Sequence, residues 1–170
     1  MDHAQRREGS EGGRFRILKD PDMTAFARLA PLRAVHQFAE RWISNDLIAL
    51  ITRLGVAAIF LQSGRTKVDG ILHITDGTYA LFAEEYRLPL IPTDIAAHLA
   101  TYSEHLFSIL LIVGLFTRFS ALAFLGMTTV IEVFVYPDAW PTHLSWAALL
   151  IFLIARGGGA WSLDRVLRLD

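Results

Sequence analysis

The stretch IAAHLATYSEHLFSILLIVGLF, residues 95–116, decides the fold of this chain. It matches the ~20 residues that an α-helix needs to cross the ~30 Å hydrocarbon layer of a bilayer. Yet it carries Glu104 and His105 near its middle. Ionisable side chains at that depth are costly and usually face a protein interior or a wet cavity. We therefore expect a membrane helix with one polar face.

Three further apolar stretches repeat this pattern, and Arg53 and Glu132 lie inside two of them. Only a few residues separate the second stretch from the third and the third from the fourth, which forces these neighbours to run antiparallel. The sequence therefore predicts an all-α membrane protein built on an antiparallel bundle of four transmembrane helices. The apolar stretches are Leu47–Gln62, Ile95–Phe116, Phe119–Tyr136 and Ala139–Ala155, and the helices are expected at 47–63, 95–116, 118–136 and 140–156, within a membrane domain of 47–156.

Composition excludes several classes of protein. Of the 170 residues, 53% are hydrophobic and 19% are charged, and the net charge of −1 gives no basis for nucleic-acid binding. Cysteine is absent, so the chain can supply neither a thiol redox centre nor a cysteine metal site. It contains no nucleotide-binding loop, nucleophile elbow or zinc-protease motif. Enzymatic activity stays open, at most as a subunit of an oxidoreductase.

The segments outside the four helices have distinct patterns. Residues 1–30 have mixed charge and are expected to be a flexible cytoplasmic tail. Residues 31–46 have apolar side chains at helical spacing, which favours an amphipathic helix at the membrane surface over one packed on protein. Residues 64–94 form an outer loop in which a short interfacial helix is expected at 78–87. Gly157–Gly159 are expected to end the last helix, and residues 157–170 are expected to form a flexible cytoplasmic tail.

The distribution of positive charge predicts the orientation. If both termini lie in the cytoplasm, only Arg65, Lys67 and Arg87 flank the helices on the outer side, whereas the remaining flanking Lys and Arg residues lie inside. Cytoplasmic flanks of membrane helices are enriched in these residues. The chain is therefore expected to be a multi-pass membrane protein with both termini inside.

The polar face of the second helix is the leading candidate for chemistry. Glu104 lies close enough to the expected midplane to pair with Arg53 of the first helix, or else to be protonated. Such a pair would be either structural or functional, and both readings stay open. The face has i, i+3, i+4 spacing and comprises His98, Thr101, Glu104, His105 and Ser108.

A second group of polar residues lies towards the outer side. We expect Gln62, His105, Glu132, Tyr136 and His143 to line one outward-facing cavity. Such a cavity could hold the head group of a quinone, relay protons or bind a metal. His105, Glu132 and His143 are the candidate metal ligands, although their spacing matches no known metal motif.

Several short motifs resemble those of the DoxX family of small four-helix membrane proteins. The resemblance covers Arg53 to Asp164, about two-thirds of the chain, and leaves 1–46 outside the usual pattern. The motifs are Arg53-Leu54-Gly55 with Phe60, Gly64-x-x-Lys67, Leu88-Pro89, Tyr102-x-Glu104, and Gly114 to Arg118. The loop FVYPDAWPTH, residues 134–143, resembles one subgroup, which is associated with gene clusters for metal-dependent peptide-modifying enzymes.

The resemblance implies a bacterial inner-membrane protein. Family members are linked to membrane redox systems, one branch to a thiosulfate:quinone oxidoreductase and another to oxidative-stress complexes with thiol proteins. Carried over position by position, it points to Arg53, Gly64, Lys67, Glu104 and Arg118. Any thiol chemistry would then reside in a partner protein.

Three functions follow as hypotheses. The first is a membrane subunit of a redox or metal-stress system that binds quinone or relays protons and electrons to a partner. The second is a component that transports a small solute or metal, and the third is a scaffold that recruits a soluble partner through 1–46 or 64–94. The expected partners are the lipid bilayer and either further copies of the chain or another protein.

Overall fold

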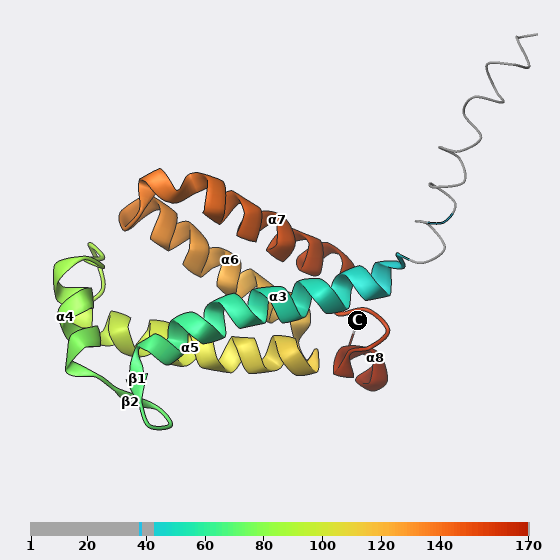
Figure 1. Cartoon of the computed structure of the whole chain (residues 1–170), viewed down its shortest axis with the longest axis horizontal. Coiled ribbons are helices and arrows are strands. Elements are labelled where there is room, and N and C mark those ends of the chain that lie inside the picture. Colours follow the sequence, from blue (N-terminus) through green and yellow to red (C-terminus); the bar gives the residue numbers. More distant parts are fainter. Residues whose placement is uncertain (1–37, 39–42, 170) are drawn as a thin grey trace, which may run out of the picture. The chain divides into compact units, whose positions relative to one another are not determined.

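The structure is a computed structural model that describes residue 38 and residues 43–169 (Figure 1). The tail predicted for 1–30 and most of the interfacial helix predicted for 31–46 lie outside these residues. Four described helices are long and apolar enough to cross a membrane, as predicted, and their bounds agree with the predicted ones to within one turn. They are α3 (Asn45–Thr66), α5 (Thr93–Val113), α6 (Thr117–Phe134) and α7 (Trp140–Arg156), with a short 3₁₀ helix, η1 (Pro137–Ala139), directly before α7.

The four helices form an antiparallel bundle. α3 packs mainly on α5 and α6 mainly on α7, while α5–α6 and α3–α7 contacts join the two pairs (Figure 1). At the centre, the rings of Phe60 and Phe124 stack with their centroids 3.9 Å apart. Small residues such as Ala57 and Ala121 are fully buried and allow close helix packing, as is typical of membrane bundles.

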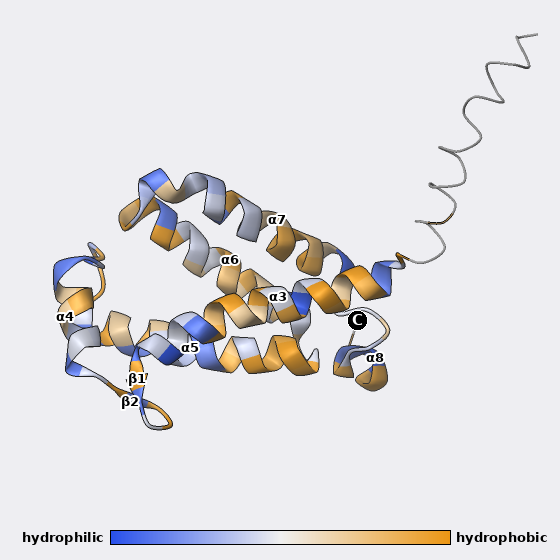
Figure 2. Cartoon of the chain, viewed as in Figure 1, coloured by the Kyte–Doolittle hydropathy of each residue, from blue (hydrophilic) through white to orange (hydrophobic). Residues whose placement is uncertain are grey.

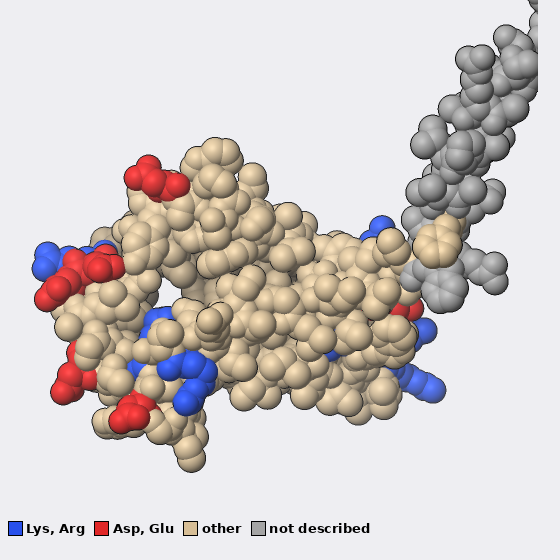
Figure 3. Space-filling model, viewed as in Figure 1, with Lys and Arg blue, Asp and Glu red and all other residues tan. Residues whose placement is uncertain are grey.

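The surface of the described residues fits a bilayer. Hydrophobic residues predominate along the four long helices (Figure 2). On the face shown in Figure 3, Lys, Arg, Asp and Glu cluster at the two ends of the bundle, with an uncharged band between them. Large apolar side chains such as Ile109, Leu122 and Ile151 are more than half exposed. In lipid this exposure carries no hydrophobic penalty, because the surrounding acyl chains are equally apolar.

The segment between α3 and α5 contains more regular secondary structure than the expected outer loop, which had one short helix. β1 (Val68–Asp69) and β2 (His73–Ile74) form a small antiparallel hairpin, which the sequence did not reveal. α4 (Asp76–Glu84) follows; the helix predicted at 78–87 therefore exists but begins and ends earlier. Thr75 caps it by accepting a hydrogen bond from the Thr78 amide at 3.2 Å. We call this part of the bundle the hairpin end.

The residues after α7 correct one expectation. Instead of forming a flexible tail, they fold back over the end of the bundle opposite the hairpin and include α8 (Leu163–Leu167). The Asp164 carboxylate accepts hydrogen bonds from the backbone amides of Phe116, at 2.6 Å, and Thr117, at 2.8 Å. These amides are free because they begin α6, whose positive dipole end favours an anion. We call this part the C-terminal end.

Removing this long-range cap should weaken the fold. Asp164→Ala leaves two amides at the start of α6 without their acceptor and should lower the free energy of unfolding by about 2 kcal/mol. Arg165→Ala, an exposed neighbour, is the control and should change it by less than about 0.5 kcal/mol. Unfolding by sodium dodecyl sulfate in mixed micelles measures both. Equal losses would contradict a capping role for Asp164.

Candidate functional site

A buried ion pair between α3 and α5 is the most polar feature inside the described part of the bundle. The Lys67 ammonium, at the end of α3, lies 2.8 Å from Glu104 Oε2 and 3.1 Å from Glu104 Oε1. Ser63, one turn before Lys67, donates to Glu104 Oε1 at 3.1 Å and accepts from the Lys67 ammonium at 2.8 Å. The two charged side chains are 9% and 4% exposed. Each charge therefore has a partner away from water.

Gly64 allows this contact to form. A Cβ atom at this position would lie 2.9 Å from the ring of His105, closer than Cβ atoms approach in proteins, and 3.1 Å from Glu104 Cβ, a tight contact. The absence of a side chain thus lets α3 and α5 approach each other at the level of the ion pair. The family resemblance pointed to Gly64, Lys67 and Glu104, and the structure gives the physical reason why the three belong together.

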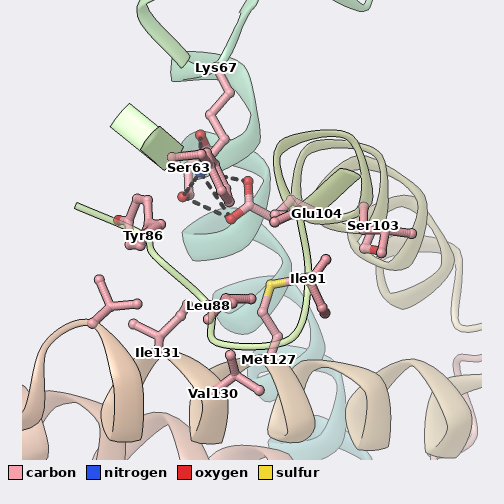
Figure 4. Close-up of a pocket in the computed structure, with 15 residues that line it drawn as sticks. Ser63, Lys67, Tyr86, Leu88, Ile91, Ser103, Glu104, Met127, Val130 and Ile131 are labelled. Carbon is pink, nitrogen blue, oxygen red and sulfur yellow. Dashed lines mark hydrogen bonds and ion pairs between the residues drawn. The ribbon is translucent and has the colours of Figure 1, made fainter. Parts of the chain in front are cut away.

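The ion pair lies in the wall of a cavity of about 220 Å³ (Figure 4). The cavity is lined by residues of α3, α4, α5 and α6 and of the chain that runs from α4 to α5. Apart from Lys67, Glu104, Ser63 and Ser103, its walls are largely apolar. The other lining residues are Phe82, Tyr86, Leu88, Ile91, Ala96, Leu99, Ala100, Met127, Val130, Ile131 and Val135.

The chain above this cavity is tied to the end of α6. Tyr136 donates a hydrogen bond to Glu85 Oε2 at 2.8 Å, and its ring meets that of Tyr86 edge to face with centroids 5.6 Å apart. Hydrogen bonding to Tyr86 and Glu85 raises the pKa of Tyr136, so its hydroxyl stays protonated and keeps donating. Tyr136 therefore holds a wall of the cavity in place instead of lining it.

The candidate pair of Arg53 and Glu104 does not form in the structure. Arg53 is fully buried, but it lies near the C-terminal end and donates to the carbonyls of Leu111, Ile112 and Trp161 at 3.0, 3.3 and 2.6 Å. Two of these carbonyls are at the end of α5, where backbone acceptors lack helical partners and a cation is favourable. Glu104 takes Lys67 instead, because Lys67 is next to it across the helix interface.

The other predicted residues do not share one cavity. Gln62 is exposed, and His105 lines an apolar groove between α5 and the hairpin. Glu132 and His143 do meet, with Glu132 Oε2 2.6 Å from His143 Nδ1, in a different cavity between α6 and α7. The prediction failed because helical spacing shows which residues share a face but not which faces meet.

These positions also bear on the suggested metal site. Among the described residues no three His, Asp or Glu side chains gather closely enough to hold a metal ion. His105 is directed elsewhere, since its Nδ1 lies 2.8 Å from the Thr101 carbonyl oxygen. The ligand set His105, Glu132 and His143 is thus not brought together.

Sequence reasoning missed Ser63, Tyr86 and Asp164. Ser63 carried a usable signal, because it precedes Lys67 by four residues and so shares its helical face. Tyr86 and Asp164 carried none, since their roles depend on how segments outside the helices fold back onto the bundle.

Comparison with known proteins agrees with this architecture. The DoxX family model matches residues 48–137, which include most of α3, all of α5 and α6 and the residues that line the cavity between them. An uncharacterized protein of Haemophilus influenzae is 32% identical over 136 residues, a match that covers 74% of this chain and 87% of that protein. No solved structure matches the chain. From the family match, the extent of this relative and the four membrane-spanning helices, we conclude that the chain is a multi-pass membrane protein of the DoxX family.

Proposed function

We propose that the protein is a bacterial inner-membrane subunit of a redox system and that its α3–α5–α6 cavity holds the head group of a lipid-soluble quinone. The observation that carries the proposal is the Lys67 ammonium in the wall of a largely apolar cavity inside a membrane bundle. Ligand sites combine apolar walls with a few convergent polar groups in this way.

The donors at the cavity suit a quinone carbonyl. The three N–H donors of Lys67 already face the Glu104 carboxylate, the Ser63 hydroxyl and, at 3.2 Å, the Ser63 carbonyl, which together hold the ammonium in one position. A quinone carbonyl would therefore share one of these donors. Glu104 balances its charge, so the site can present a strong donor without a net charge in the bilayer. The walls formed by Leu88, Met127 and Ile131 would surround the apolar ring (Figure 4).

The protein would work with a partner and with its C-terminal end in the cytoplasm. When bound, a quinone would accept electrons that the chain, which has no cysteine, must receive from a partner protein. Among the described residues, the exposed cations Arg65 and Arg87 are at the hairpin end, whereas Arg118, Arg156, Arg165 and Arg168 are at the C-terminal end. This distribution supports a cytoplasmic C-terminal end.

Blocking the cavity tests the proposal. Ala100 lines the cavity on α5, and Ala100→Phe would fill part of it; Leu122→Phe adds a ring on the exposed face of α6 and serves as the control. In nanodiscs doped with ubiquinone or menaquinone, we expect Ala100→Phe to weaken binding at least tenfold and Leu122→Phe to leave it unchanged.

Ser63→Ala should weaken binding by a few fold, because it removes one of the two side chains that hold Lys67. Quinone that stays with the repurified nanodisc protein, quantified by extraction and mass spectrometry, gives the affinity. Equal retention by all variants, or no retention by the folded wild type, would overturn the proposal.

A further inference from the structure

A second cavity of about 250 Å³ lies between α6 and α7, on the face of α6 that points away from the quinone site proposed above. We propose that it binds a lipid-soluble aromatic alcohol, of the phenol type, through His143 Nε2. The inference rests on different residues and holds whether or not a quinone occupies the first cavity.

The geometry constrains one nitrogen of the His143 ring. Glu132 Oε2 lies 2.6 Å from His143 Nδ1, a distance typical of a short charge-assisted hydrogen bond from N–H to a carboxylate. A neutral imidazole that carries its proton on Nδ1 presents a lone pair at Nε2. In this form of the ring, His143 Nε2 is a hydrogen-bond acceptor.

That acceptor is available to the cavity. His143 is 6% exposed, and Nε2 has no hydrogen-bond partner within the part of the chain that the structure describes. His105 Nε2 is also unpaired but is sealed from solvent, whereas His143 Nε2 is not sealed and His143 lines the cavity. Because buried acceptors in proteins are normally hydrogen-bonded, we infer that a ligand supplies the donor for His143 Nε2.

The residues that line the second cavity indicate which kind of ligand could supply this donor. The walls include the indole of Trp140 and the side chains of Leu125 and Leu144, which favour an aromatic or aliphatic body. Trp140 and Leu144 are 60% and 61% exposed, so the cavity opens at the lipid-facing surface near the hairpin end. Thr128 and Thr129 use their hydroxyl protons on helix carbonyls and can offer only acceptors. The site thus accepts a hydrogen bond from the hydroxyl group of a ligand that partitions into lipid.

A matched pair of probes tests this on the unaltered protein. Para-octylphenol can donate a hydrogen bond, whereas para-octylanisole, its methyl ether, cannot. We expect the full chain in liposomes to bind the phenol roughly tenfold more tightly than the ether, as the loss of one hydrogen bond implies. Magic-angle-spinning NMR of ¹⁵N-histidine-labelled protein should show a shift of His143 Nε2 with the phenol only, assigned through His143→Gln.

Two variants separate this site from the first cavity. Glu132→Gln no longer fixes the proton on Nδ1 and should reduce the preference for the phenol severalfold, while Ser63→Ala, in the other cavity, should leave it unchanged. Equal binding of phenol and ether, or a His143 ring protonated on both nitrogens, would overturn the proposal. Phenol binding that is lost in Ser63→Ala instead of Glu132→Gln would also overturn it.

Discussion

Lys67→Met and Glu104→Met should each lower the free energy of unfolding by about 3–5 kcal/mol, and the double variant should regain most of that loss. Either single change leaves a charge that is at least nine-tenths buried without its partner. The double change removes both charges and keeps side chains of similar length, so no buried charge remains unpaired. Titration with sodium dodecyl sulfate in mixed micelles gives the four stabilities of the cycle.

The double variant also separates stability from function. If it folds, the proposed quinone site has lost its donor while its apolar walls remain, and quinone retention should fall at least tenfold. Additive losses in the cycle would show that Lys67 and Glu104 do not act as a pair. A stable double variant that retains quinone like the wild type would leave the pair with a structural role alone.

Arg53→Met should lower the free energy of unfolding by about 3 kcal/mol or more. Arg53 is fully buried and donates to three carbonyls, on α5 and on the segment before α8. A methionine fills much of the space but leaves the Trp161 carbonyl and the end of α5 without a donor, and hydrogen bonds to a charged group contribute about 1.5–3 kcal/mol each.

Arg65→Met provides a matched control for this prediction. Arg65 also donates to backbone carbonyls, those of Gly70 and Ile71 at 3.0 Å, but it is exposed and water can replace it. We expect its loss to cost less than about 1 kcal/mol. Arg53→Lys should fall between the two, because a single ammonium lacks the planar fork that reaches α5 and Trp161 together. A loss no larger in Arg53→Met than in Arg65→Met would show that burial does not determine the cost.

The burial of Arg53 could be predicted from the sequence, but its hydrogen-bond partners could not. Hydropathy identified Arg53 and Glu104 as ionisable groups inside membrane helices, and both are indeed buried. It offered them as a candidate pair and left the pairing open, because helix rotation is set by packing. Lys67 follows Arg53 by fourteen residues, roughly 21 Å along a helix, and its position near the outer end of the first helix led to its being counted as a flanking charge. In the structure its ammonium instead lies beside Glu104.

The sequence by itself determined the number, length and antiparallel order of the four described membrane helices, because the bilayer imposes a length and a hydropathy that can be read along the chain. It also determined that ionisable side chains would lie inside the bundle. Only the tertiary structure decided which of them meet: Lys67 with Glu104, Glu132 with His143, and Arg53 with backbone carbonyls. Pairing depends on helix rotation and axial offset, which arise from close contacts such as Gly64 against His105 and from the folding back of residues 157–169.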